Sequence, residues 1–178
     1  MEDSFSDILK DYVKKMLPLL CAIGLILLMY IPIRFPLSKF LRPDTAMICV
    51  YFWTLYRRDL FGPISVAVLG IVADSLGAVP LGVNMFVFIS VYVLAITFGI
   101  YVNTKPFAIS WIGFALISLV AFLIKWLLMS VYYSNFLPLT GVLLGYVATV
   151  LLYPLVARLN VVIQNRFLAT DEVIYEQR

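Results

Sequence analysis

Hydrophobic residues along this chain gather in long blocks separated by short polar stretches, a pattern that predicts helices rather than strands. Six apolar segments cover residues 17–33, 44–56, 61–79, 82–102, 107–133 and 138–159. A helix needs about 20 apolar residues to cross a bilayer, and most of these segments come close to that length. We therefore expect an all-α, polytopic membrane protein with six transmembrane helices.

The second segment, residues 44–56, is short for a transmembrane helix. It would form a helix of about 20 Å, against a hydrocarbon thickness of about 30 Å. Either neighbouring helices shield this segment from lipid, or flanking residues extend it. The turn Arg57-Arg58-Asp59 is tight, so we expect the second and third segments to pack as a helical hairpin.

Both ends of the chain differ from the apolar segments. In residues 1–16, apolar side chains recur with the helical period along one stripe, and the lysines lie off it or beside it. This pattern indicates an amphipathic helix in the cytoplasmic membrane interface, or a helical N-terminal extension of the first span. Residues 160–178 are polar, and we expect a cytoplasmic tail whose last residues are disordered. The six-helix transmembrane domain then covers residues 17–159.

The placement of lysine and arginine predicts the orientation in the membrane. With the N-terminus in the cytoplasm, most of these residues lie on the cytoplasmic side. Arg34, Lys39 and Arg42 lie on the opposite side, and Lys125 falls within a span. We expect both termini in the cytoplasm, in agreement with an even number of spans.

Composition narrows the class of protein further. The chain is 63% hydrophobic and 13% charged, more apolar than a soluble domain of 178 residues can bury. It has no histidine, which removes the commonest general base and zinc ligand. Cys21 and Cys49 stand alone in apolar segments and indicate neither a disulfide framework nor a metal site. A net charge of +3 is too weak and scattered to indicate nucleic-acid binding.

Enzyme motifs do not occur in the chain: no phosphate-binding loop, no zinc-protease motif and no nucleophile elbow is present. Its serines have no histidine to activate them. We therefore expect no catalytic residue, no metal site and no cofactor, and we interpret the protein as a non-enzyme.

The chemically unusual residue is Asp74, in the apolar stretch GIVADSLGAVPLGVN. A carboxylate in a span is energetically costly and usually faces the protein interior. On a helix it shares one face with small residues, which permit close helix packing, and with one proline: Pro63, Ala67, Gly70 and Gly77. That face is the inner seam of the protein or a docking surface for a partner. The inner seam is favoured, because an outward carboxylate would face lipid whenever the partner is absent.

Three interpretations of the Asp74 carboxylate remain open. It can be ionised and paired with Lys125 in the fifth segment, although Lys125 could instead snorkel to the outer interface. It can be neutral, or hydrogen-bonded to local donors such as backbone amides of the following loop or the Asn84 side chain. It can also serve as a proton or cation relay.

Two short stretches carry helix-boundary chemistry. In GAVPLGVN, Gly77 and Gly82 allow positive φ, while Asn84 can cap the fourth helix. Before the second segment, Pro43 suits a first helical turn, and Asp44 is favoured at a helix N-terminus. The aromatic residues that follow indicate a belt at the cytoplasmic interface or a groove for a partner helix: Tyr51, Phe52, Trp53 and Tyr56.

These motifs, in this order, resemble the rod shape-determining protein MreD family. The resemblance rests on an Arg-Pro helix start, an aromatic segment, a G-x-x-x-D patch and a glycine turn: Arg42-Pro43, Tyr51 and Trp53, Gly70 with Asp74, and Gly77 followed by Leu81-Gly82. The order and spacing of all six spans agree as well. Lys125 is not part of the family pattern, so an Asp74–Lys125 pair would be particular to this chain.

The resemblance implies a bacterial inner-membrane protein of the machinery that elongates the lateral cell wall by peptidoglycan synthesis. Such proteins act with the single-span MreC protein, with RodA and its class B penicillin-binding protein, and indirectly with MreB, and have no known catalytic activity. The implied role is a non-enzymatic scaffold that helps maintain rod shape. The family fold is similar to the substrate-binding components of energy-coupling-factor transporters. A small-molecule-binding transporter component is therefore the alternative, although a shared fold does not carry function.

Overall fold

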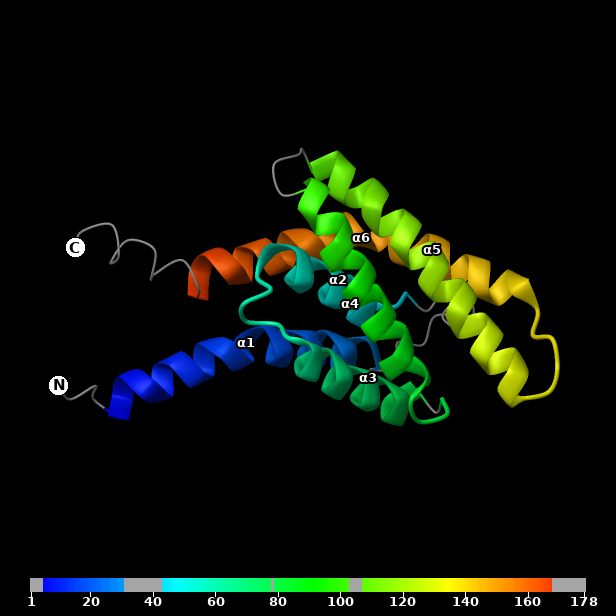
Figure 1. The fold of residues 1–178 in the computed structure, drawn as a ribbon, viewed down its shortest axis with the longest axis horizontal. Coiled ribbons are helices and arrows are strands. Elements are labelled where there is room, and N and C mark those ends of the chain that lie inside the picture. The colour runs from blue at the N-terminus through cyan, green and yellow to red at the C-terminus, as the bar shows by residue number, and fades with distance from the viewer. Residues whose placement is uncertain (1–4, 31–42, 78, 103–106, 168–178) are drawn as a thin grey trace.

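The computed structural model describes residues 5–30, 43–77, 79–102 and 107–167, with side chains from Met16 onward apart from a few at helix ends. All regular structure in these ranges is helical and no strand occurs there, which confirms the all-α prediction. The described ranges hold six helices: α1 (Phe5–Tyr30), α2 (Thr45–Tyr56), α3 (Pro63–Gly77), α4 (Val83–Val102), α5 (Phe107–Tyr132) and α6 (Leu139–Phe167). Figure 1 shows them packed as one bundle.

The ends of α1 and α6 differ from the predicted segments. α1 runs without a break through Pro18, so residues 5–16 continue the first apolar segment, as the second of the two interpretations has it. α6 continues through Pro154 to Phe167 and takes up the first part of the predicted tail. Residues 168–178 lie outside the described part of the chain. A membrane-interface location for residues 1–16 stays a prediction.

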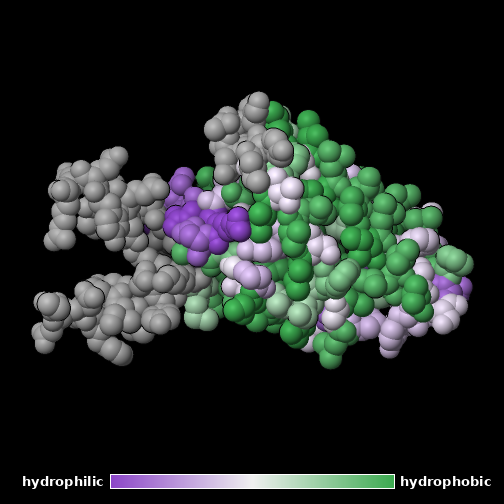
Figure 2. Space-filling model, in the orientation of Figure 1, coloured by the Kyte–Doolittle hydropathy of each residue, from purple (hydrophilic) through white to green (hydrophobic). Residues whose placement is uncertain are grey.

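By length and composition, two of the described helices, α5 and α6, are long and apolar enough to cross a membrane. The apolar parts of the other four helices are shorter, so six spans are not confirmed. The face shown in Figure 2 carries a broad hydrophobic surface between more hydrophilic regions at the two ends of the molecule. α5 and α6 contribute many exposed aliphatic side chains to the molecular surface, among them Leu116, Leu127, Leu151 and Leu155.

The short helix α2 occupies the centre of the bundle, where it packs against α1, α4 and α6. Every residue from Thr45 to Leu55 is buried. Neighbouring helices therefore shield α2, which was one of the two expected solutions to its length.

The predicted interfacial aromatic belt is wrong for three of its four residues. Tyr51, Phe52 and Trp53 are at most 1% exposed, and Tyr56 alone is well exposed. The ring of Tyr51 lies 5.3 Å from that of Phe114 on α5 and 5.9 Å from that of Tyr153 on α6. Because α2 is surrounded by other helices, its aromatic side chains form the core instead of reaching the interface.

The expected hairpin of the second and third segments does not form. α3 packs mainly against α4 and only slightly against α2. A Cβ atom on Gly70 would lie 2.7 Å from the backbone nitrogen of Met85 on α4, and closer still to its Cα atom. The missing side chain of Gly70 thus allows the backbones of α3 and α4 to approach each other.

We expect Gly70→Ala to lower the free energy of unfolding by about 1–3 kcal/mol, because the new methyl group would force α3 and α4 apart. Unfolding of the purified protein in detergent, followed by circular dichroism, measures this change. Gly141→Ala in α6 is the matched control, because a Cβ atom there meets nothing within 4 Å. Equal stability of the two variants would contradict the close-packing argument.

Candidate functional site

The Asp74 carboxylate, on α3, binds the N-terminus of α4. Asp74 is fully buried. Its Oδ2 accepts a hydrogen bond of 2.8 Å from the backbone N–H of Gly82, and its Oδ1 accepts one of 2.8 Å from that of Asn84. The first amides of a helix have no partner within the helix, and the helix dipole favours a negative charge beside them. Asp74 therefore caps α4 from the preceding helix.

The loop between α3 and α4 brings these amides to Asp74. Gly82 has φ +100°, a conformation that favours glycine, and its carbonyl accepts the N–H of Phe86 at 2.9 Å. Gly77 is the last residue of α3, and Gly82 is the glycine with positive φ in the described residues. Asn84 lies inside α4, so the expectation that it caps this helix is wrong, and the cap comes from Asp74 instead.

Of the expected interpretations of Asp74, the structure shows hydrogen bonding to loop backbone amides. The proposed Asp74–Lys125 ion pair does not form. Lys125 Nζ lies instead 3.2 Å from Oδ2 of Asp44. The physical reason is that both oxygens of Asp74 are occupied by the start of α4, whereas Asp44 has one oxygen directed toward α5.

Asp44 joins three helices. Its Oδ1 accepts the N–H of Met47 at 3.1 Å, so it is the N-cap of α2. The predicted helix start and the place of Asp44 at it are confirmed, whereas Pro43 precedes the cap and does not lie in the first turn. Its own N–H donates to Oγ1 of Thr149 on α6 at 2.9 Å. Its Oδ2 accepts from Lys125 on α5. Thr149 is a contact that sequence reasoning missed, because a threonine within an apolar helix has no distinguishing local signal.

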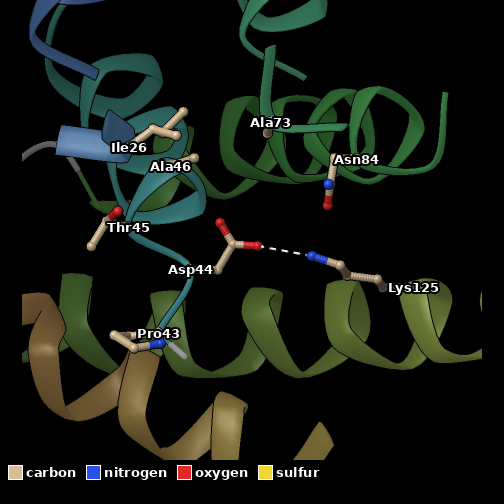
Figure 3. Close-up of a pocket in the computed structure, with 8 residues that line it drawn as sticks. All are labelled: Ile26, Pro43, Asp44, Thr45, Ala46, Ala73, Asn84 and Lys125. Atoms are coloured by element: carbon tan, nitrogen blue, oxygen red, sulfur yellow. Dashed lines mark hydrogen bonds and ion pairs between the residues drawn. The ribbon is translucent and has the colours of Figure 1, made fainter. Parts of the chain in front are cut away.

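Asp44, Lys125 and Asn84 line one small cavity, in which a volume of about 70 Å³ is open to the centres of water molecules. Figure 3 shows side chains of α2, α4 and α5 converging on it. The lining residues are Ile26, Pro43, Asp44, Thr45, Ala46, Ala73, Asn84 and Lys125. Asn84 is 4% exposed, and its Oδ1 has no hydrogen-bond partner among the described residues.

The other candidate residues that the structure describes do not line this cavity, and they lie in different parts of the bundle. Gly70 is buried, and with Asp74 it lies in the inner seam between α3 and α4, whereas Pro63 is exposed at the start of α3. Trp53 is fully buried near the other end of α2, away from the cavity. Arg42 lies outside the described residues.

A comparison with protein-family models matches residues 11–162, nearly the whole chain, to "MreD: rod shape-determining protein MreD". The chain belongs to the MreD family. No curated protein and no solved structure matches the chain. MreD membership implies a role in rod shape determination, and the family is one of shape-determining proteins rather than a known enzyme family. Together with the two long apolar helices, it indicates a membrane protein.

We expect Asp74→Leu to destabilise the protein strongly, because it leaves the buried amide of Asn84 and the partly buried amide of Gly82 without this acceptor, and an unsatisfied buried amide costs about 1–3 kcal/mol. Asp74→Asn keeps one acceptor oxygen and should lose less stability. Unfolding in detergent measures both variants. Ser75→Ala is the neighbouring control, since this exposed hydroxyl bonds only within its own helix, to the carbonyl of Ile71. A Leu variant as stable as this control would show that the cap is dispensable.

A double-mutant cycle distinguishes the two possible partners of Lys125. Lys125→Met should destabilise the protein by leaving the Asp44 charge unpaired, and Asp44→Asn should relieve part of that loss because asparagine still caps α2. Asp74→Asn should add its own loss without relief, because it does not contact Lys125. Free energies of unfolding give the coupling for each pair. Coupling to Asp74 and additivity with Asp44 would overturn the assignment.

Proposed function

We propose that this MreD-family chain is a non-enzymatic scaffold in the bacterial inner membrane that holds together the rod complex during lateral cell-wall elongation. The observation that carries the proposal is the family match over residues 11–162. The buried polar groups support it, because they bind the protein's own helices: Asp74 caps α4, and Asp44 caps α2 and pairs with Lys125. These bonds connect helices of one chain to each other, as expected of polar groups that stabilise the fold.

In the proposed topology all six helices cross the membrane and both termini are cytoplasmic. The described start of α1 and the described end of α6 lie at the same end of the molecule, which supports this arrangement (Figure 1). The hydrophobic surface between hydrophilic ends has the distribution expected of a bilayer-embedded bundle (Figure 2). Because α2 is shielded by its neighbours, its length of 12 residues does not oppose the topology.

The proposed partner is the single membrane helix of an MreC-type protein, with RodA and the class B penicillin-binding protein also in the complex and MreB associated indirectly. Helices associate in lipid through van der Waals packing of complementary surfaces. The outward side of α3 offers one apolar surface for such packing, with exposed Ile64, Val68 and Ile71 at helical spacing. Because the Asp74 carboxylate is buried and bonded to the amides of Gly82 and Asn84, that surface carries no unpaired carboxylate.

The second candidate, a small-molecule-binding component of a transporter, is favoured by the convergence of Asp44, Asn84 and Lys125 on one cavity. The size of that cavity opposes it. Sites for drug-sized or cofactor-sized ligands usually have volumes of about 300–1,000 Å³, and the space open to water centres here is about 70 Å³. The scaffold is therefore the function that the structure supports best.

Purification of the tagged chain from its own membranes in mild detergent tests the two functions against each other. We expect a single-span protein to co-purify at a fixed ratio, and Ile71→Asn on the outward side of α3 to weaken that complex more than Leu151→Asn on the exposed side of α6. A stoichiometric small metabolite that raises the melting temperature of the chain without any protein partner would overturn the scaffold function.

A further inference from the structure

The cavity between α2, α4 and α5 is lined by polar groups, and contacts between the helices leave part of their hydrogen-bonding capacity unused. Its polar side chains are the Asp44 carboxylate, the Thr45 hydroxyl, the Lys125 ammonium group and the Asn84 amide. Asp44 is engaged at both oxygens, by Met47 and by Lys125. Two further groups have unused hydrogen-bonding capacity: the buried Oδ1 of Asn84, and the ammonium group of Lys125 beyond its bond to Asp44.

The Oδ1 atom of Asn84 is a buried acceptor without a donor among the described residues. Leaving such a group unsatisfied costs its lost hydration, so buried amide oxygens nearly always have a partner. Asn84 is 4% exposed, which excludes free contact with bulk solvent. A partner that enters the cavity would remove this penalty.

Lys125 presents the complementary group. An ammonium group has three protons to donate, and the bond to Asp44 takes up one of them. Figure 3 shows the Lys125 ammonium and the Asn84 amide directed into the same space from α5 and α4. A group placed between them must accept a hydrogen bond from nitrogen and donate one to oxygen. A hydroxyl group does both, whereas a carboxylate cannot donate and a metal cation would be repelled by the lysine.

We propose that this cavity is a hydrated binding site in which a water molecule bridges Lys125 Nζ and Asn84 Oδ1. A cavity needs about 10–15 Å³ open to water centres to hold one water molecule, and a buried water typically makes two to four hydrogen bonds. The available volume of about 70 Å³ meets this requirement with room for further water molecules beside Asp44. The bridge joins α4 and α5 and, through the ion pair, the start of α2.

Water-edited solid-state NMR of the full chain in lipid bilayers tests the site. With ¹³C at alanine Cβ, magnetisation from water should reach Ala46 and Ala73, which line the cavity, several-fold faster than it reaches Ala95 and Ala121. All four side chains are buried, at most 6% exposed, so none of them has free contact with bulk solvent. Equal transfer to the two pairs of alanines would overturn the proposal.

Two variants at residue 84 make the test specific. Asn84→Leu removes the acceptor and fills the space, and should reduce transfer to Ala73 to the rate at Ala95, while the backbone N–H of residue 84 still donates to Asp74. Asn84→Ser retains a polar group and should keep fast transfer. Unchanged fast transfer in a folded Asn84→Leu variant would overturn the bridge. If that variant does not fold, the wild-type comparison decides alone.

The same spectra distinguish water from an organic hydroxyl group. Transfer to Ala73 from exchangeable water protons supports water as the occupant. Transfer from the C–H protons of a lipid or a co-purified solute, retained after exchange into D₂O, would assign the hydroxyl chemistry to that molecule. This second result would overturn water as the bridge.

Discussion

The capping of α4 by the carboxylate of Asp74 is the interaction on which the arrangement of the bundle depends. Two hydrogen bonds of 2.8 Å fix the beginning of α4 against α3 and supply an acceptor to amides that have none within the helix. Gly70 lies one helical turn earlier and allows the two backbones to approach each other. Because the start of α4 is held there, Asn84 is directed toward the cavity that α2 and α5 complete.

A second polar cluster, formed by Asp44, Lys125 and Thr149, holds the short helix α2 in the same way, by capping its start and binding neighbouring helices. The Asp44 carboxylate accepts the N–H of Met47 in the first turn of α2 and pairs with Lys125 on α5. The backbone N–H of Asp44 donates to Thr149 on α6. A buried charge destabilises a bundle when it has no partner, so an interaction that pairs it holds the helices together. Asp44 is paired with Lys125, and Asp74 is bonded to two backbone amides. The two clusters adjoin the cavity, one through Asn84 and the other through Asp44 and Lys125, and their charged side chains hold helices in place. This suits a protein whose family role is structural.

Several local features of this arrangement could be predicted from the sequence. Asp44 after Pro43 indicates a helix start, and the sequence from Gly77 to Asn84 indicates a turn, because backbone constraints on proline and glycine are local. Other features could not. The partner of Lys125 is Asp44 rather than Asp74, and Trp53 lies in the core rather than at the interface. Both depend on which helices are neighbours, and an apolar segment carries little information about its neighbours in space.

The sequence by itself determined the helical class, the approximate extent of the apolar helices and the motifs that identify the MreD family, because hydrophobic blocks and turn residues act over short distances along the chain. Only the tertiary structure decided which carboxylate meets Lys125, that Asp74 caps a helix other than its own, and that Asn84 faces a polar cavity. The pairing of Lys125 with Asp44 joins residues 81 positions apart. The bond between Asp74 and Asn84 depends on how the loop after α3 turns back toward it. Helix periodicity assigns a side chain to one side of its helix, and the packing of the helices decides what it meets there.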